Sequence, residues 1–242
     1  MVKNFITAAI LMSGMIHGLE NTKHHIVLNG TSCSGKSTLA HQIATIWKSN
    51  NVAYQHFSID RLYHDMLNSL SDNQKKDLPT LLARAQEAQV THPVVAFEMW
   101  PDYMNNLFED WFASYFDALQ KTSCSILELV CDHNAIMKKF LEQWAAHHQP
   151  ALSFVKIYCS KAIANERLNK RNSSYDTCEH RDCTTIEANY NCLSTIHGLK
   201  TYDKEVDTSH HTPSSAAMLV LSAPLATTAM SLNAKNFIQP IP

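Results

Sequence analysis

The feature that most constrains this chain is the eight-residue segment Gly30–Ser37, with the sequence GTSCSGKS. It matches the pattern G-x-x-x-x-G-K-[ST] in full. This spacing lets successive backbone N–H groups wrap a phosphate, while the N-terminal amides of the following helix face the same anion. The chain has only five glycines, and two of them lie in this segment, where the backbone needs conformational freedom. The segment therefore predicts a binding site for a nucleoside triphosphate.

The residues on both sides of the segment support this interpretation over a chance match in a surface loop. An apolar run, His25–Asn29, precedes it as a predicted buried strand, and an amphipathic helix is predicted over Ser37–Lys48. We expect Lys36 to reach the β- and γ-phosphates and the Ser37 hydroxyl to bind Mg²⁺. The predicted nucleotide contacts are Gly30, Thr31, Ser32, Cys33, Ser34, Gly35, Lys36, Ser37 and Thr38.

Strand and helix patterns alternate along the rest of the chain. Together with the phosphate-binding segment, this alternation predicts a P-loop NTPase-type α/β fold, a three-layer α/β/α domain with a parallel sheet of about five strands. We expect the domain to cover 25–222, between an extension or signal-like segment over 1–24 and a tail over 223–242. The predicted strands are 25–29, 52–59, 125–130, 153–158 and 205–208; the predicted helices are 37–48, 61–70, 102–120, 134–147, 161–171 and one that opens at Thr212-Pro213 with Thr212 as N-cap.

Composition limits the partners and the compartment. The 242 residues carry 20 Lys and Arg against 22 Asp and Glu with no basic block, which argues against a nucleic-acid partner. Seven scattered cysteines are typical of free thiols in a reducing compartment. The apolar run Phe5–Ile16 is too short for a stable membrane span and lacks a small-x-small cleavage site, so we expect a cytoplasmic protein, with export as the alternative. Nothing in the sequence indicates the oligomeric state.

Asp60 follows the second predicted strand. Ligands of an open parallel sheet bind beyond the carboxyl ends of its strands, which predicts that Asp60 lies beside the phosphate-binding segment. A carboxylate there can accept the proton of an attacking hydroxyl. Asp60 can also serve as the N-cap of the helix predicted from Arg61, and the two roles are compatible.

Four segments, in the same order, resemble the chloramphenicol phosphotransferase family. They are Ile26–Ser37, Phe57–Asp60, Val155–Cys159 with the helix that follows it, and Tyr202–Thr208. The last, Tyr-Asp-Lys-Glu-Val-Asp-Thr, is the most telling, because P-loops are common and this sequence is not. The resemblance spans roughly 25–222 and is weakest in the middle third.

The resemblance implies ATP- and Mg²⁺-dependent phosphorylation of a hydroxyl group on a small-molecule acceptor. It makes Asp60 the general base and places Arg167 and Arg171 in a helical lid, over about 161–198, that closes over the phosphates. The two arginines are four residues apart and so face one side of a helix, where guanidinium groups could clamp phosphate charge or simply be solvated.

The chain departs from the family pattern in three places. The segment Asn172–Tyr175 stands where a further lid arginine is expected, and Arg181 is a candidate replacement. Glu128 stands on the third strand where the family tends to have aspartates; it is expected to hold a Mg²⁺-bound water, or else to be a strand-end carboxylate without a role. The region 71–120 differs most, so the resemblance does not identify the acceptor.

Three further groups of residues have both a functional and a structural interpretation. The Cys/His cluster over 178–192 could bind zinc, although its spacing fits no standard closed site, or could belong to a lid with free thiols. The aromatic and Met side chains at 97–103 could line an acceptor pocket or pack in the core. The histidine pairs at 24–25, 147–148 and 210–211 are predicted to be surface or loop residues.

Two other functions remain open from the sequence. One is a nucleotide, nucleotide-sugar or toxin-type kinase on the same fold. The other is a non-catalytic NTP-binding regulatory or effector protein, which the missing lid arginine and the unusual third strand favour.

Overall fold

The computed structural model describes four stretches of the chain together with single residues between the first two. The stretches are 24–58, 102–129, 152–172 and 202–222, and the additional residues are 61, 65, 68, 70–74, 76, 77 and 80. Predictions that fall elsewhere, such as the helix over 134–147, the terminal segments and the cluster over 178–192, lie outside the described residues. None of the described helices is both long enough and apolar enough to cross a membrane.

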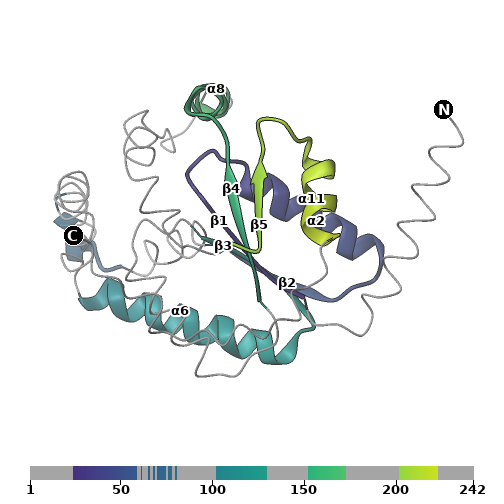
Figure 1. Cartoon of the computed structure of the whole chain (residues 1–242). Coiled ribbons are helices and arrows are strands. Elements are labelled where there is room, and N and C mark those ends of the chain that lie inside the picture. Colours follow the sequence, from purple (N-terminus) through teal and green to yellow (C-terminus); the bar gives the residue numbers. More distant parts are fainter. Residues whose placement is uncertain are drawn as a thin grey trace, which may run out of the picture.

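The described elements form a five-stranded parallel sheet with helices packed against it (Figure 1). The strand order is β2-β3-β1-β4-β5, and all four neighbouring pairs are parallel. This confirms the predicted parallel sheet of about five strands. The strands are β1 (His24–Gly30), β2 (Tyr54–Ser58), β3 (Cys124–Leu129), β4 (Leu152–Tyr158) and β5 (Lys204–Asp207); the helices are α2 (Lys36–Ser49), α6 (Asp102–Lys121), α8 (Lys161–Asn172) and α11 (Pro213–Leu221).

Helices cover both faces of the sheet. Alternate residues of each strand point to opposite sides, so each face presents side chains to the helices packed on it. On one face, Ile26 and Leu28 of β1 belong to a buried cluster shared with α2 and α11. On the other face, Phe57 of β2 packs edge-to-face against Tyr115 of α6, with ring centroids 4.8 Å apart. The predicted three-layer α/β/α architecture is therefore confirmed.

The helix α2 forms because its apolar residues recur at helical spacing. Leu39, Ile43 and Trp47 are four residues apart, and all three are completely buried. The helix ends where Asn51 takes a left-handed conformation, with φ of 57°, and the Val52 amide donates to the Trp47 carbonyl. Val52 and Ala53 connect this turn to the next strand. As a result, β2 begins at Tyr54 and not at residue 52, where it is predicted.

The prediction for the histidines at 24–25 is wrong. Both belong to β1, a central strand, and His25 is completely buried. Its Nδ1 is 2.9 Å from the Ser125 hydroxyl of β3, and burial lowers the pKa of His24. The strand begins one residue earlier than its apolar pattern suggests because His24 pairs with Cys124. By contrast, His210 and His211 are exposed, as predicted.

Candidate active site

The phosphate-binding segment connects the carboxyl end of β1 to α2. Gly30 passes so close to β4 that a Cβ atom there would lie 2.1 Å from the Ile157 carbonyl oxygen. Gly35 has φ of +95°, a conformation that glycine adopts more readily than other residues. Cys33 also has a positive φ, of 58°. The two glycines of the motif therefore serve close approach at one end and backbone reversal at the other.

We expect Gly30→Ala to destabilise the protein, because the added methyl group would overlap the backbone of β4. Overpacking of this kind costs about 1–3 kcal/mol, and contact with backbone leaves little room for relief. Denaturant unfolding measures the change. An unchanged unfolding midpoint would show that β1 and β4 can separate here without cost.

The N-terminus of α2 is open to an anion. Gly35 is its N-cap, and among the described residues no side chain accepts a hydrogen bond there. The first turn also contains no acidic residue. Uncapped N–H groups and the positive end of the helix dipole favour a phosphate at this position.

Lys36 is the first residue of α2, and its side chain contacts the backbone of the phosphate-binding loop. Its Nζ donates to the Gly30 carbonyl at 2.7 Å and to the Thr31 carbonyl at 2.6 Å, and the residue is buried. The ammonium group thus lies at the loop whose amides would hold the phosphates. These two bonds hold the amine at the loop.

The Ser37 hydroxyl meets the carboxylate of Glu128. Ser37 Oγ donates to Glu128 Oε2 at 2.6 Å, and the other carboxylate oxygen, Oε1, lies 2.7 Å from His56 Nε2. Glu128 is buried, with only 4% of its side chain exposed. The two residues predicted to bind the metal are therefore brought together, although they are 91 positions apart in the chain.

This pair fits Mg²⁺. The ion prefers oxygen ligands and is commonly held by one or two carboxylates together with substrate phosphates. A hydroxyl and a carboxylate oxygen, adjacent at the phosphate-binding loop, supply that kind of donor set.

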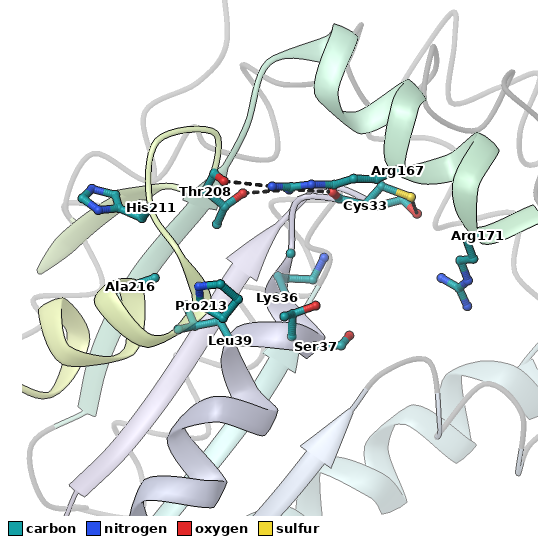
Figure 2. A pocket seen from close by; sticks show the side chains of 13 residues that line it. Cys33, Lys36, Ser37, Leu39, Arg167, Arg171, Thr208, His211, Pro213 and Ala216 are labelled. Carbon is teal, nitrogen blue, oxygen red and sulfur yellow. Dashed lines mark hydrogen bonds between the residues drawn. The ribbon is translucent and has the colours of Figure 1, made fainter. Parts of the chain in front are cut away.

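A pocket of about 410 Å³ opens over the loop (Figure 2). In the view, His211 and Arg171 lie at opposite sides, with Lys36 and Ser37 between them. The lining combines the phosphate-binding loop, one face of α8 and the start of α11; its residues are Ser32, Cys33, Gly35, Lys36, Ser37, Thr38, Leu39, Arg167, Arg171, Thr208, His211, Pro213 and Ala216.

Arg167 ties α8 to the phosphate-binding loop and to the end of β5. Its guanidinium donates to the Thr208 hydroxyl and the Thr208 carbonyl, both at 2.8 Å, and to the Cys33 carbonyl at 3.3 Å (Figure 2). Thr208 Oγ1 in turn donates to the Ser34 carbonyl at 2.6 Å. Arg167 and Thr208 therefore form a hydrogen-bonded bridge across the loop.

We expect Arg167→Ala to weaken nucleotide binding by at least about tenfold, because the loop loses charged hydrogen bonds that hold its conformation, each worth roughly 1.5–3 kcal/mol. Lys170→Ala is the matched control, since Lys170 is an exposed cation on the same helix. Calorimetric titration with ADP gives both affinities. If the bridge acts as a unit, adding Thr208→Val to Arg167→Ala should cause little further loss of ADP affinity. Losses of affinity that add fully in the double variant would contradict this expectation.

Arg171 lines the same pocket but differs from Arg167 in its contacts. Within the described part of the chain its guanidinium has no hydrogen-bond or ion-pair partner. It lies one helical turn beyond Arg167, as the spacing of four predicts. Its charge is therefore available to an anion in the pocket.

The segment Tyr202–Thr208 contacts the end of β1 and the phosphate-binding loop. Asn29 donates to the Tyr202 hydroxyl at 2.7 Å, and Ser209 N donates to the carboxylate of Asp207 at 2.8 Å. Burial acts to raise the pKa of Asp207, but the hydrogen bonds from Ser209 and the nearby charges of His210 and His211 outweigh it and hold the pKa below its usual value. Tyr202–Thr208 thus joins the end of β1, the P-loop and α8.

The structure places most of the predicted site residues around one pocket, but not all can be located. The P-loop residues, Glu128, Arg167 and Arg171 surround or adjoin it. Asp60 and Arg181 lie outside the described residues. Sequence reasoning missed His56, because its contact with Glu128 depends on the β2–β3 register. It also missed the lining residues His211 and Pro213, whose signal was their position just after the Tyr202–Thr208 motif.

The model of the family described as chloramphenicol phosphotransferase-like protein matches residues 23–224. No match is found among curated proteins.

Among solved structures, a gluconokinase from Sinorhizobium meliloti 1021 aligns with a TM-score of 0.50 and 17% identity over 82% of this chain and 91% of its own. A tunicamycin resistance protein from Deinococcus radiodurans aligns with a TM-score of 0.48 and 13% identity, over 84% of this chain and 98% of its own. At such identities, the likeness to the first of these structures concerns the fold alone.

Proposed function

Because the chain belongs to the chloramphenicol phosphotransferase-like protein family, we propose that it is an ATP- and Mg²⁺-dependent kinase that phosphorylates a hydroxyl group of a small molecule. The observation that carries the proposal is the 2.6 Å contact between Ser37 and Glu128 at the phosphate-binding loop. It puts a hydroxyl and a carboxylate where a nucleotide-bound Mg²⁺ needs oxygen ligands. The third strand, which carries Glu128, therefore supports a site for a metal-bound nucleotide.

The described residues divide the work of binding the triphosphate. The amides of the loop and of the first turn of α2 hold the phosphates, and Lys36 adds a positive charge at the same loop. Ser37 and Glu128 would hold Mg²⁺, which would neutralise phosphate charge when bound. The base and ribose extend toward His211 and Pro213 at the other side of the pocket.

The two arginines take different parts in this proposal. Arg171 is the cation that contacts the transferring phosphoryl group, a task suited to guanidinium. Arg167 positions the loop through Cys33 and Thr208. Arg167 thus supports transfer indirectly, whereas Arg171 acts on the substrate itself.

Asp60 is the general base in this proposal. It follows Ser58, the last residue of β2, by two positions, and the family resemblance assigns it that role. It accepts the proton of the acceptor hydroxyl as the new O–P bond forms and the bond between the γ-phosphorus and the ADP oxygen breaks. The products are ADP and a phosphomonoester.

An ATP-consumption screen against small-molecule hydroxyl compounds tests the proposal. Its panel includes phenicols, nucleosides and UDP-sugars, so that it also separates an antibiotic kinase from a nucleotide or nucleotide-sugar kinase. We expect at least one class to stimulate ADP formation. Slow hydrolysis that no acceptor stimulates would point instead to a regulatory NTP-binding protein.

A further inference from the structure

We propose that His56 is a positioning residue that fixes the Glu128 carboxylate so that it offers only one oxygen toward the Mg²⁺ of the bound nucleotide. The inference rests on the proposed function, because it takes Ser37 and Glu128 as the metal-binding pair. His56 does not touch the nucleotide or the metal in this account. His56 acts through Glu128. By fixing that carboxylate, it makes the site select Mg²⁺ over Ca²⁺.

The pairing of two strands places His56 beside Glu128. In the β2–β3 register, Ser58 pairs with Glu128 and His56 pairs with Ile126. Because side chains alternate along a strand, His56 and Glu128 point to the same face of the sheet as diagonal neighbours. That face also carries α2, which brings Ser37 to the same place.

The two oxygens of Glu128 have different partners on different elements. A carboxylate only accepts hydrogen bonds, so the 2.7 Å contact between His56 Nε2 and Oε1 assigns the hydrogen to Nε2. Oε2 accepts from Ser37 at 2.6 Å. The terminal torsion of a glutamate is broad by itself. Here both ends of the carboxylate are held, one from β2 and one from α2, so the group has a fixed orientation.

The role fits a ligand-holding residue better than a core residue. His56 lies on β2, which is at the edge of the sheet formed by the described strands. Its side chain is 34% exposed, whereas that of Glu128 is 4% exposed. The imidazole is not needed to fill the core. A buried carboxylate is costly unless its oxygens are hydrogen-bonded, and ligating carboxylates are commonly held by such outer partners.

Holding Oε1 has a consequence for metal choice. Ca²⁺ accepts carboxylates through both oxygens and tolerates irregular coordination, whereas Mg²⁺ requires near-octahedral geometry at shorter distances. With Oε1 bonded to His56, Glu128 presents Oε2 alone. The arrangement therefore favours Mg²⁺, and loss of the imidazole would free Oε1 for a larger ion.

The test measures metal-dependent nucleotide binding and needs no acceptor. ADP binding to the full chain is followed by calorimetry while Mg²⁺ or Ca²⁺ is titrated, for the wild type, His56→Leu, His56→Gln and His41→Gln. His41 is an exposed histidine of α2 and serves as the matched control. Glutamine keeps an N–H donor that can reach Glu128, so it tests for rescue.

We expect His56→Leu to raise the Mg²⁺ concentration for half-maximal ADP binding by about tenfold, the lower end of the range for loss of an outer-shell partner. In the same variant, the concentrations of Mg²⁺ and of Ca²⁺ that give half-maximal ADP binding should become more similar than in the wild type. His56→Gln should lie closer to the wild type than His56→Leu does, and His41→Gln should match the wild type. In a Glu128→Gln background, His56→Leu should have no further effect on the metal requirement.

Several results would overturn the inference. One is an unchanged Mg²⁺ requirement in His56→Leu, or an effect of His56→Leu that is equally large in the Glu128→Gln background. Another is that His56→Leu weakens ADP binding equally with and without metal and also lowers thermal stability. The last is that ADP binding to the wild type does not depend on Mg²⁺. Its failure differs from failure of the proposed function. Phosphorylation of an acceptor with no effect of His56→Leu contradicts this inference alone, whereas the expected metal shifts without any phosphorylated acceptor contradict the proposed function alone.

Discussion

Lys36→Ala is expected to abolish phosphoryl transfer. Lys36 is the buried cation of the phosphate-binding loop, where its ammonium lies against the Gly30 and Thr31 carbonyls. Removing one preorganised donor from a site that stabilises transition-state charge costs about 10²- to 10³-fold in turnover. Steady-state kinetics with an acceptor identified by the ATP-consumption screen measures the loss.

The control for Lys36→Ala is Lys48→Ala, which removes an exposed lysine from the last turn of the same helix. Circular dichroism and thermal unfolding verify that the Lys36 variant keeps its fold, because the lost hydrogen bonds to the loop could also disturb it. A folded Lys36→Ala protein that retains a tenth or more of wild-type turnover would contradict the assigned role. Loss of activity in Lys48→Ala would show that the assay reports something other than the site.

Asp60→Asn is expected to stop transfer while leaving nucleotide binding intact. Asparagine has the same shape but cannot accept the acceptor's proton, and a positioned general base contributes about 10²- to 10⁴-fold. We expect turnover to fall by that factor and ADP affinity to remain within a few-fold of the wild type. Kinetics and calorimetry on the same preparation measure the two quantities.

The same substitution separates the two interpretations of Asp60. Asparagine is about as good an N-cap as aspartate, so Asp60→Asn keeps a cap and removes a base, whereas Asp60→Ala removes both. Asp65→Asn, an exposed carboxylate five residues further along, is the control. Full turnover of Asp60→Asn on the true acceptor would rule out the base. A loss of stability in Asp60→Ala alone, without a loss of turnover in either variant, would leave only the cap.

The fold was predictable because its local signals agreed with one another. Leu39, Ile43 and Trp47 mark the buried face of α2, and Thr212-Pro213 marks the start of α11, where the Thr212 side chain accepts from Ser215 N as predicted for an N-cap. Errors arose where tertiary structure decided the outcome. His24 and His25 read as surface residues, but the central position of β1 in the sheet buries them.

The site was predictable in its residues and less so in its contacts. The P-loop spacing identifies Lys36 and Ser37, because each position in that motif has a fixed relation to the phosphates. For Arg167 the sequence predicts a phosphate clamp or a solvated side chain, and it does not reveal the bonds of its guanidinium to Thr208 and Cys33, residues distant in sequence. The His56–Glu128 pair depends on strand register, which a single sequence does not specify. Long-range pairing therefore limits what residue patterns can predict here.

The most direct test of the central claim is to follow the fate of the γ-phosphate. Phosphorus-31 NMR of a reaction with ATP, Mg²⁺ and the acceptor that most stimulates ATP consumption distinguishes a phosphomonoester from inorganic phosphate. A hydroxyl kinase must produce ADP and phosphomonoester in equal amounts, and we expect both signals to be absent with Lys36→Ala. Equal amounts of ADP and inorganic phosphate, with the acceptor unchanged, would contradict the account and leave the protein as an NTP-hydrolysing or NTP-binding member of its family.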